Sequence, residues 1–259
     1  MSAQRWERAA GQYATGEHKS GDELRVAVEF ATPKRTDRVL DIGAGAGHMA
    51  LAMAPRVANV VLTDPVGAML DAARRVFQQA GQTNADYIKA SAEALPFEAG
   101  SFDIVTTRLA AHHFDDLDLA IREVGRVLKP SGRFIFVDTV APDDAESANF
   151  LHGVETLRDP THRHTLNKAE WVRRIQSQGF TVERSAMVRK AHPFEPWLER
   201  GGEDAATMAM VRARFARAPS APLAALDIVT RNGPVAPFSD PPVIVLARPY
   251  TGSQRRYRD

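Results

Sequence analysis

A carboxylate and three glycines stand together at the end of an apolar run near the start of the chain. Asp41 lies in the run that ends at Ile42, and Gly43, Gly45 and Gly47 follow at alternate positions. Glycine lets the backbone pass close to a ligand, because a Cβ there would collide with it. The pattern predicts a strand, a turn and a helix that approach a bound nucleoside.

The same turn discriminates between two kinds of nucleotide ligand. The dinucleotide pattern G-x-G-x-x-G needs a glycine where His48 stands. A carboxylate at Asp41 would repel a pyrophosphate, yet it suits a ligand that carries the ammonium group of an amino acid. The turn therefore favours S-adenosylmethionine (SAM) over NAD. A tight strand-to-helix connection without a ligand is the alternative.

A second carboxylate, Asp64, ends the next apolar run and precedes Pro65. At the end of a strand it can accept hydrogen bonds from both hydroxyls of a ribose. It can also cap the helix that is expected to begin at Pro65, and both roles are compatible.

The segment after the third apolar run is expected to line the adenine slot. Ser91 and the backbone amide of Ala92 suit the edge of the base, while Leu95 and Phe97 are expected to pack in the core.

His112 and His113 are the candidates for a general base, because they follow the fourth apolar run. Methyl transfer from a sulfonium depends mainly on in-line positioning. A base is needed only if the nucleophile must lose a proton, and histidine has a suitable ordinary pKa. Arg108 is expected to contact SAM through its backbone. A turn histidine held by its neighbours is the alternative for each ring.

Two other patterns are similar to those of more specific sites. His162 and His164 alternate in a loop, but neither an HExxH spacing nor a cysteine pair accompanies them, so no metal is expected. That loop is expected at the edge of the pocket. Ser239-Asp240-Pro241-Pro242 is superficially similar to the N/D-P-P-Y motif of DNA and amide methyltransferases, but it precedes the last strand and is expected to form a turn.

The elements that must position these residues alternate between strand and helix patterns, which predicts a parallel sheet with crossover helices. The expected strands are Arg38 to Ile42, Ala58 to Thr63, Asp86 to Ala90, Phe102 to Thr107, Arg133 to Thr139, Phe180 to Val188 and Val243 to Ala247. The expected helices are His48 to Ala54, Val66 to Ala80, Leu117 to Leu128, and one that a capping box of Asn167 and Glu170 opens.

Three segments fall outside this alternation. Lys129 to Gly132 is expected to stop a helix and turn the chain into the fifth strand. Residues 1–36 are expected to form one or two helices over the top of the sheet. The proline-rich residues 189–240 are expected to form an insertion with about two helices, serving as a lid or a dimerisation element in a homodimer.

Composition limits the function classes. The 259 residues suit one α/β domain with a modest insertion. The formal charge of +1 gives no field that would attract nucleic acid or a membrane surface, and the chain has no cysteine for a disulfide or thiolate. There is no apolar run near the ~20 residues of a membrane span. The first residues are not expected to form a signal peptide, because they have no apolar run. A cytoplasmic location is expected.

Five motifs in order carry a resemblance to a known family. They are Leu40-Asp41-Ile42-Gly43-x-Gly45-x-Gly47, Asp64, Ala92-Glu93-x-Leu95-Pro96-Phe97, Ser101-Phe102-Asp103, and Arg126-Val127-Leu128-Lys129-Pro130-x-Gly132. This series resembles the class I SAM-dependent methyltransferases, within them the small-molecule group related to the quinone-biosynthesis C-methyltransferases. The resemblance implies a Rossmann-like α/β fold, a three-layer sandwich whose seven-stranded, mostly parallel sheet has its last strand antiparallel.

The resemblance also implies a set of cofactor contacts. Asp41 and Gly43 would lie near the methionine part of SAM, Asp64 would bind the ribose, and Ser91 with Ala92 would face the adenine. Gly45, Gly47, Pro65 and Glu93 are the further residues expected to contact the cofactor. Many members have an aspartate where Ser91 stands. Met69 would pack against the adenine or in the core. Tyr13 and Lys19 stand in a segment similar to the flap that covers SAM, and would contact the SAM carboxylate.

Together these features predict an enzyme that transfers a methyl group from SAM to an O, N or C nucleophile of a small organic molecule, leaving S-adenosylhomocysteine. Two other hypotheses remain open: a SAM-binding enzyme that catalyses a cyclisation or rearrangement without methyl transfer, and a non-catalytic nucleoside-binding module.

Overall fold

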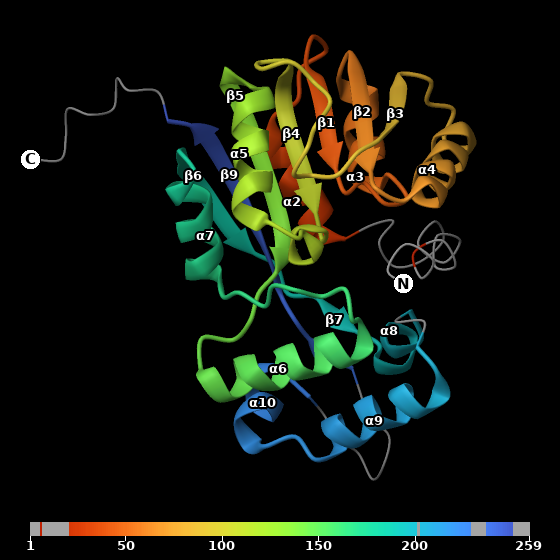
Figure 1. Ribbon diagram of the computed structural model, residues 1–259, viewed down its shortest axis with the longest axis vertical. Coiled ribbons are helices and arrows are strands. Elements are labelled where there is room, and N and C mark those ends of the chain that lie inside the picture. The colour runs from red at the N-terminus through yellow and green to blue at the C-terminus, as the bar shows by residue number, and fades with distance from the viewer. Residues whose placement is uncertain (1–5, 7–20, 201–202, 229–236, 251–259) are drawn as a thin grey trace, which may run out of the picture.

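The computed structural model describes Trp6 and residues 21–200, 203–228 and 237–250, and its centre is a seven-stranded sheet (Figure 1). The strands of this sheet are β1 (Arg38–Ile42), β2 (Asn59–Asp64), β3 (Ala85–Lys89), β4 (Phe102–Arg108), β5 (Leu128–Thr139), β6 (Phe180–Met187) and β9 (Pro242–Pro249). Their order is β3-β2-β1-β4-β5-β9-β6. Strands β1 to β5 pair in parallel, and β9 is antiparallel to both β5 and β6. The predicted Rossmann-like sheet with its last strand antiparallel is confirmed.

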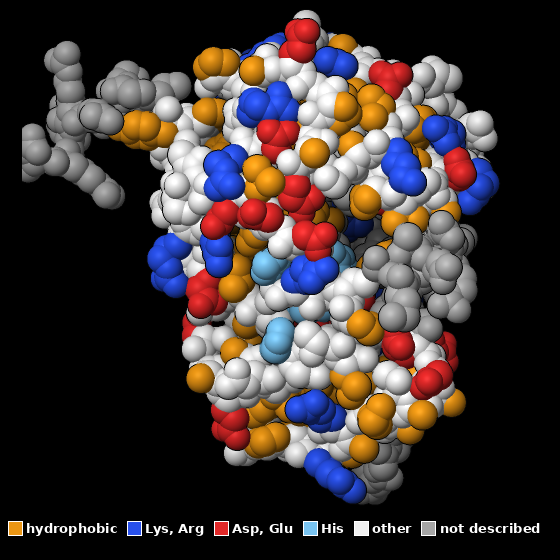
Figure 2. All heavy atoms as spheres, viewed as in Figure 1, with side chains coloured by type: hydrophobic (Ala, Val, Ile, Leu, Met, Phe, Trp, Pro, Cys, Tyr) orange, Lys and Arg blue, Asp and Glu red, His pale blue; other side chains and the backbone are white. Residues whose placement is uncertain are grey.

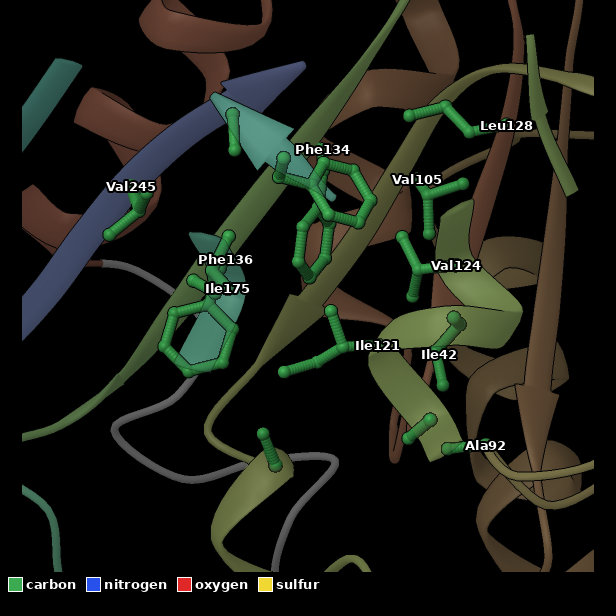
Figure 3. Packing of buried hydrophobic residues seen from close by; sticks show 14 of the residues in the cluster. Ile42, Ala92, Val105, Ile121, Val124, Leu128, Phe134, Phe136, Ile175 and Val245 are labelled. Atoms are coloured by element: carbon green, nitrogen blue, oxygen red, sulfur yellow. The ribbon is translucent and has the colours of Figure 1, made fainter. Parts of the chain in front are cut away.

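Helices cover both faces of the sheet, because each has one apolar stripe to bury. Helices α2 (Asp22–Ala31), α3 (His48–Met53) and α4 (Gly67–Gln79) pack on one face. Helices α5 (Leu117–Val127) and α7 (Lys168–Ser177) pack on the other. Figure 3 shows this second core, where Ile121 and Val124 of α5 and Ile175 of α7 lie among the sheet residues Phe134 and Phe136. Two rigid layers thereby fix the carboxyl ends of the parallel strands.

A separate group of helices, here called the cap, lies beyond the carboxyl ends of these strands (Figure 1). The cap consists of α6 (Ala145–Arg158), α8 (Phe194–Arg200), α9 (Ala205–Ala216), α10 (Ser220–Ala225) and the short strands β7 (Ala191–His192) and β8 (Phe238–Ser239). It has its own apolar core, made chiefly of Leu151, Val154, Phe194, Trp197, Leu198, Val211, Phe215 and Phe238. Two parts of the chain distant in sequence, α6 and the described residues between 191 and 239, therefore build one body over the sheet edge.

Several local predictions can be compared with this structure. The capping box is confirmed: the Asn167 side chain accepts from the Glu170 amide at 2.9 Å, and the Glu170 carboxylate accepts from the Asn167 amide at 2.8 Å. The predicted turn at 129–132 is wrong, because β5 already begins at Leu128 and the register of its pairing with β4 shifts between Phe102 and Ile104.

The helical predictions outside the repeat also need correction. Helix α2 lies on a face of the sheet, against β5 and β9, and not over its top, because it buries Leu24, Ala27 and Phe30 there. Within residues 189–240, the described part holds three helices instead of about two. No helix among those described is both long enough and apolar enough to cross a membrane.

Candidate active site

The three glycines of the first turn all adopt left-handed backbone conformations. A Cβ on Gly47, at φ +79°, would stand 2.8 Å from Leu62, so this glycine lets α3 pack closely against the sheet. A Cβ on Gly45, at φ +52°, would meet no protein atom within 4 Å. Gly43 and Gly45 line a cavity, whereas Gly47 does not belong to its wall. Gly47 is thus a packing residue in this structure, and Gly45 is the position where the backbone faces open space.

Asp64, at the end of β2, holds this loop in place. One carboxylate oxygen accepts from the Gly45 amide at 3.0 Å, and the other accepts from the Val66 amide at 2.9 Å. Burial raises the pKa of Asp64 against the effect of these hydrogen bonds. The predicted helix cap is wrong, since α4 begins at Gly67 and its N-cap is Val66. Asp64 still lines the cavity, where the ribose contact was predicted.

Asp41 lies deeper, at 1% exposure, under the same loop. Its carboxylate accepts from the Thr106 hydroxyl at 2.6 Å and from the Ala50 amide at 3.2 Å. Burial raises the pKa of Asp41 to about 6, although Thr106, Arg108 and the Ala50 amide favour its charged form. Asp41 therefore ties β1, α3 and β4 together at the floor of the cavity.

The cavity has a volume of about 930 Å³, near the upper end of the about 300–1,000 Å³ typical of ligand pockets. Its wall includes most of the residues predicted for the cofactor: Asp41, Gly43, Gly45, Asp64, Pro65, Met69, Ser91, Ala92, Glu93 and Arg108. Met69 is buried and belongs also to a small apolar cluster with Val66. Tyr13 and Lys19 lie outside the described residues.

His112 forms a buried pair with Asp138, which stands near the carboxyl end of β5. The ring Nδ1 and a carboxylate oxygen are 2.6 Å apart, and the second oxygen accepts from the His112 amide at 3.2 Å. Burial lowers the pKa of His112, but the charge and hydrogen bond of Asp138 outweigh it, so the pKa lies above the ordinary value. Because Nδ1–H donates to Asp138, Nε2 is the proton-accepting atom of this ring.

His113 has the opposite character although its ring centroid is only 4.0 Å from that of His112. Its Nδ1–H donates to the Thr161 carbonyl at 3.1 Å. Burial, and then the charge of His112, hold the pKa of His113 well below the ordinary value. Trp6 packs edge-on against the ring, with centroids 5.1 Å apart. His113 is a neutral hydrogen-bonding ring beside a more basic one.

The loop after α6 brings His162 to the same place, with its ring centroid 5.0 Å from that of His112. Burial and the charge of His112 lower the pKa of His162 to about 4. His164 instead donates from Nε2 to the Phe114 carbonyl at 2.9 Å. Figure 2 shows histidine side chains gathered between the sheet and the cap. In the described ranges, no three histidine, aspartate or glutamate side chains are placed to hold a metal ion.

The cap supplies the opposite wall of the cavity. Arg158 lies over the Trp197 ring at 4.4 Å from its centroid and pairs with Glu155 at 2.7 Å. Asp240 is buried and hydrogen-bonded to Nε2 of His192, and both residues line the cavity. Asp240 does connect β8 to β9 as the predicted turn requires, but it also contributes to the pocket.

Comparisons with known proteins agree with this geometry. A family model described as a methyltransferase domain matches residues 40–136. The uncharacterized methyltransferase YcgJ of Bacillus subtilis (strain 168) is 38% identical over 185 residues, covering 71% of this chain and 73% of YcgJ. The chain belongs to the class I SAM-dependent methyltransferases.

Two solved structures are similar to this methyltransferase over most of its chain. The crystal structure of YcgJ superposes with a TM-score of 0.82 at 32% identity, covering 89% of this chain and 99% of that one. The BH2331 protein of Bacillus halodurans C-125 gives a TM-score of 0.85 at 31% identity, covering 89% and 100%.

The likeness to the quinone enzymes is confirmed but shorter. The ubiquinone/menaquinone biosynthesis C-methyltransferase UbiE of Xanthomonas oryzae is 41% identical over 113 residues. These residues are 42% of the methyltransferase described here and 45% of UbiE, so less than half of that relative is matched.

Two kinds of functional residue, one behind the cavity wall of the methyltransferase and one in it, were not predicted from the sequence. Asp138 ends an apolar strand, as Asp41 and Asp64 do, so the same rule of acidic strand ends would have found it. Lys190 and Trp197 carry no such signal, because only the tertiary packing of the cap brings them to the sheet edge.

Proposed function

We propose that this chain transfers the methyl group of SAM to an oxygen, nitrogen or carbon nucleophile of a small organic molecule. The buried pair of His112 and Asp138 carries this proposal, because it places an oriented base in the same cavity as the glycine turn and Asp64. The volume of about 930 Å³ leaves room for a cofactor and a second small molecule.

The division of roles follows from the opposite pKa shifts of the two adjacent histidines. His112, with its raised pKa, is the stronger base, and its Nε2 takes the proton of the nucleophile. His113 stays neutral and positions the acceptor by hydrogen bonding. The nucleophile forms a bond to the methyl carbon, the carbon–sulfur bond breaks, and its electron pair stays on sulfur in S-adenosylhomocysteine.

The cofactor contacts form the second part of the proposal. Asp64 accepts from the ribose hydroxyls, and Ser91, Ala92 and Glu93 lie beside the adenine. Gly43 and Gly45 bring the backbone against the methionine part, and the ionised Asp41 stabilises its ammonium group. The enclosing cap and the net charge of +1 support a small-molecule acceptor over a nucleic acid.

The experiment is a screen of phenols, amines and enolisable carbonyl compounds with SAM that carries a deuterated methyl group. We expect one class of acceptor to gain the labelled methyl group with an equal amount of S-adenosylhomocysteine. An acceptor that is converted without forming S-adenosylhomocysteine would instead support the cyclisation or rearrangement hypothesis. Failure to bind any adenosine compound would support the non-catalytic module.

A further inference from the structure

A cluster of three buried charges joins parts of the chain that are far apart in sequence. Glu23 lies in the first turn of α2, Arg108 ends β4, and Lys190 lies in the link from β6 to the cap. The Lys190 ammonium is 2.8 Å, and the Arg108 guanidinium 3.1 Å, from the same oxygen of Glu23. Glu23 is only 2% exposed.

The cluster is a fixed, ionised arrangement. Burial raises the pKa of Glu23, but the charges of Lys190 and Arg108 and the hydrogen bond from Lys190 outweigh it, so the pKa lies below its ordinary value. A buried carboxylate with two cations keeps both of them oriented and dehydrated, which strengthens their interactions with a further anion.

The cations face the cavity and the acid does not. Arg108 and Lys190 belong to the cavity wall, whereas Glu23 lies behind them. Arg108 is also close enough to Asp41 to favour the charged form of that carboxylate. One end of the cavity therefore carries the carboxylate of Asp41, the nearby cation of Arg108 and, sharing Glu23 with Arg108, the cation of Lys190. This set complements the ammonium and carboxylate groups of an amino acid.

We propose that Lys190, with Arg108 beside it, binds the carboxylate of SAM and makes the site selective for a cofactor with a complete amino-acid tail. This inference rests on the proposed function, since it needs SAM in the cavity. Tyr13 and Lys19, which the family resemblance places at this carboxylate, lie outside the described residues. Lys190 adds a contact from the cap side, so the bound cofactor connects the sheet to the cap.

The test compares two ligands that differ only in the carboxylate: SAM and decarboxylated SAM. In Lys190→Met, the hydrophobic stem stays and the charge is lost, while Arg108 still pairs with Glu23. We expect the affinity for SAM, measured by titration calorimetry, to fall about tenfold or more, as for the loss of one charge-assisted hydrogen bond. The affinity for decarboxylated SAM should stay unchanged, which also shows that the variant is folded.

Lys129→Met is the matched control, because Lys129 also lies 2.8 Å from a carboxylate, that of Asp103, and does not line the cavity. It should bind both ligands as the unsubstituted chain does. An equal loss for both ligands in Lys190→Met, or no loss for either, overturns the inference while leaving the proposed function intact. If the unsubstituted chain binds neither ligand, the proposed function fails and this inference with it.

Discussion

Nδ1 of His112 lies 2.6 Å from a carboxylate oxygen of Asp138, which has no exposed surface. This contact fixes the tautomer of the histidine and raises its pKa. A base of this kind works only when it is neutral, so kcat should fall as the pH decreases through the pKa of His112.

His112→Ala should lower kcat with the best acceptor by about 10²- to 10⁴-fold, which is the usual contribution of a positioned general base to the rate. The affinity for SAM should change little, because the proposed role of the His112 ring is to accept the proton of the nucleophile and not to bind the cofactor. His152→Ala is the control, since His152 is exposed on α6 and does not line the cavity. Equal kcat in both variants would remove His112 from the mechanism.

Asp138→Asn should lower the pKa of His112, because the carboxylate charge that stabilises the imidazolium is lost. The decrease in kcat on acidification should then begin at a lower pH than in the unsubstituted chain, from a lower maximum. NMR titration of the His112 ring measures the pKa directly and needs no acceptor. An unchanged pKa would mean that Asp138 does not act through this ring.

Alanine substitutions at Gly45 and Gly47 should have different effects, the first on cofactor binding and the second on stability. Gly45→Ala puts a methyl group into open cavity space, so SAM affinity should fall strongly. The free energy of unfolding should decrease by only about 1–2 kcal/mol, because alanine is strained in the left-handed backbone conformation. Gly47→Ala should lower Tm more, because its Cβ would stand 2.8 Å from Leu62 and 3.1 Å from Ala73.

Gly81→Ala is the control for backbone strain alone, since Gly81 has φ +67° and no protein atom near the added Cβ. It lies outside the cavity wall and should bind SAM normally. Thermal melts and calorimetry with SAM on all three variants check the series, and normal SAM affinity in Gly45→Ala would contradict the placement of the cofactor.

Cofactor affinity should depend on the ionisation of Asp41, whose pKa is raised to about 6 by burial. A cationic ligand favours the charged carboxylate, so binding should weaken as the pH falls below about 6, approaching tenfold per pH unit for one proton. Between about pH 7 and the pKa of the SAM amino group, which for an α-amino group is about 8, the affinity should be constant. Asp41→Asn should bind SAM more weakly and without this dependence, and the same pH profile in both proteins would assign it to another group.

The sequence predicted the sheet side of this site well, for a physical reason. Asp41, Asp64 and the glycines follow apolar strands, and parallel strands bring their carboxyl ends to one edge. The cap could not be predicted in this way. His192, Trp197 and Asp240 reach the cavity because two distant segments share an apolar core, and neither segment has a repeating pattern.

Individual side chains also show which properties follow from the sequence and which depend on the tertiary structure. His112 and His113 were equivalent in the sequence, and only the positions of Asp138 and Thr161 distinguish a basic ring from a neutral one. For Asp64 the sequence predicted two roles, a ribose contact and a helix cap. The structure shows that Asp64 is not the helix cap, because the N-cap of α4 is Val66, and that its carboxylate lies in the cavity wall.

The SAM site is tested by calorimetric titration of SAM into the unsubstituted chain and into Asp64→Ala. We expect one SAM per chain, no binding of NAD, and an affinity reduced about 100-fold or more in the variant, since two hydrogen bonds from ribose to a carboxylate are lost. Circular dichroism should show that the variant is folded. Undiminished SAM affinity in a folded Asp64→Ala protein, or no SAM binding by the unsubstituted chain, would contradict a SAM site built on Asp64.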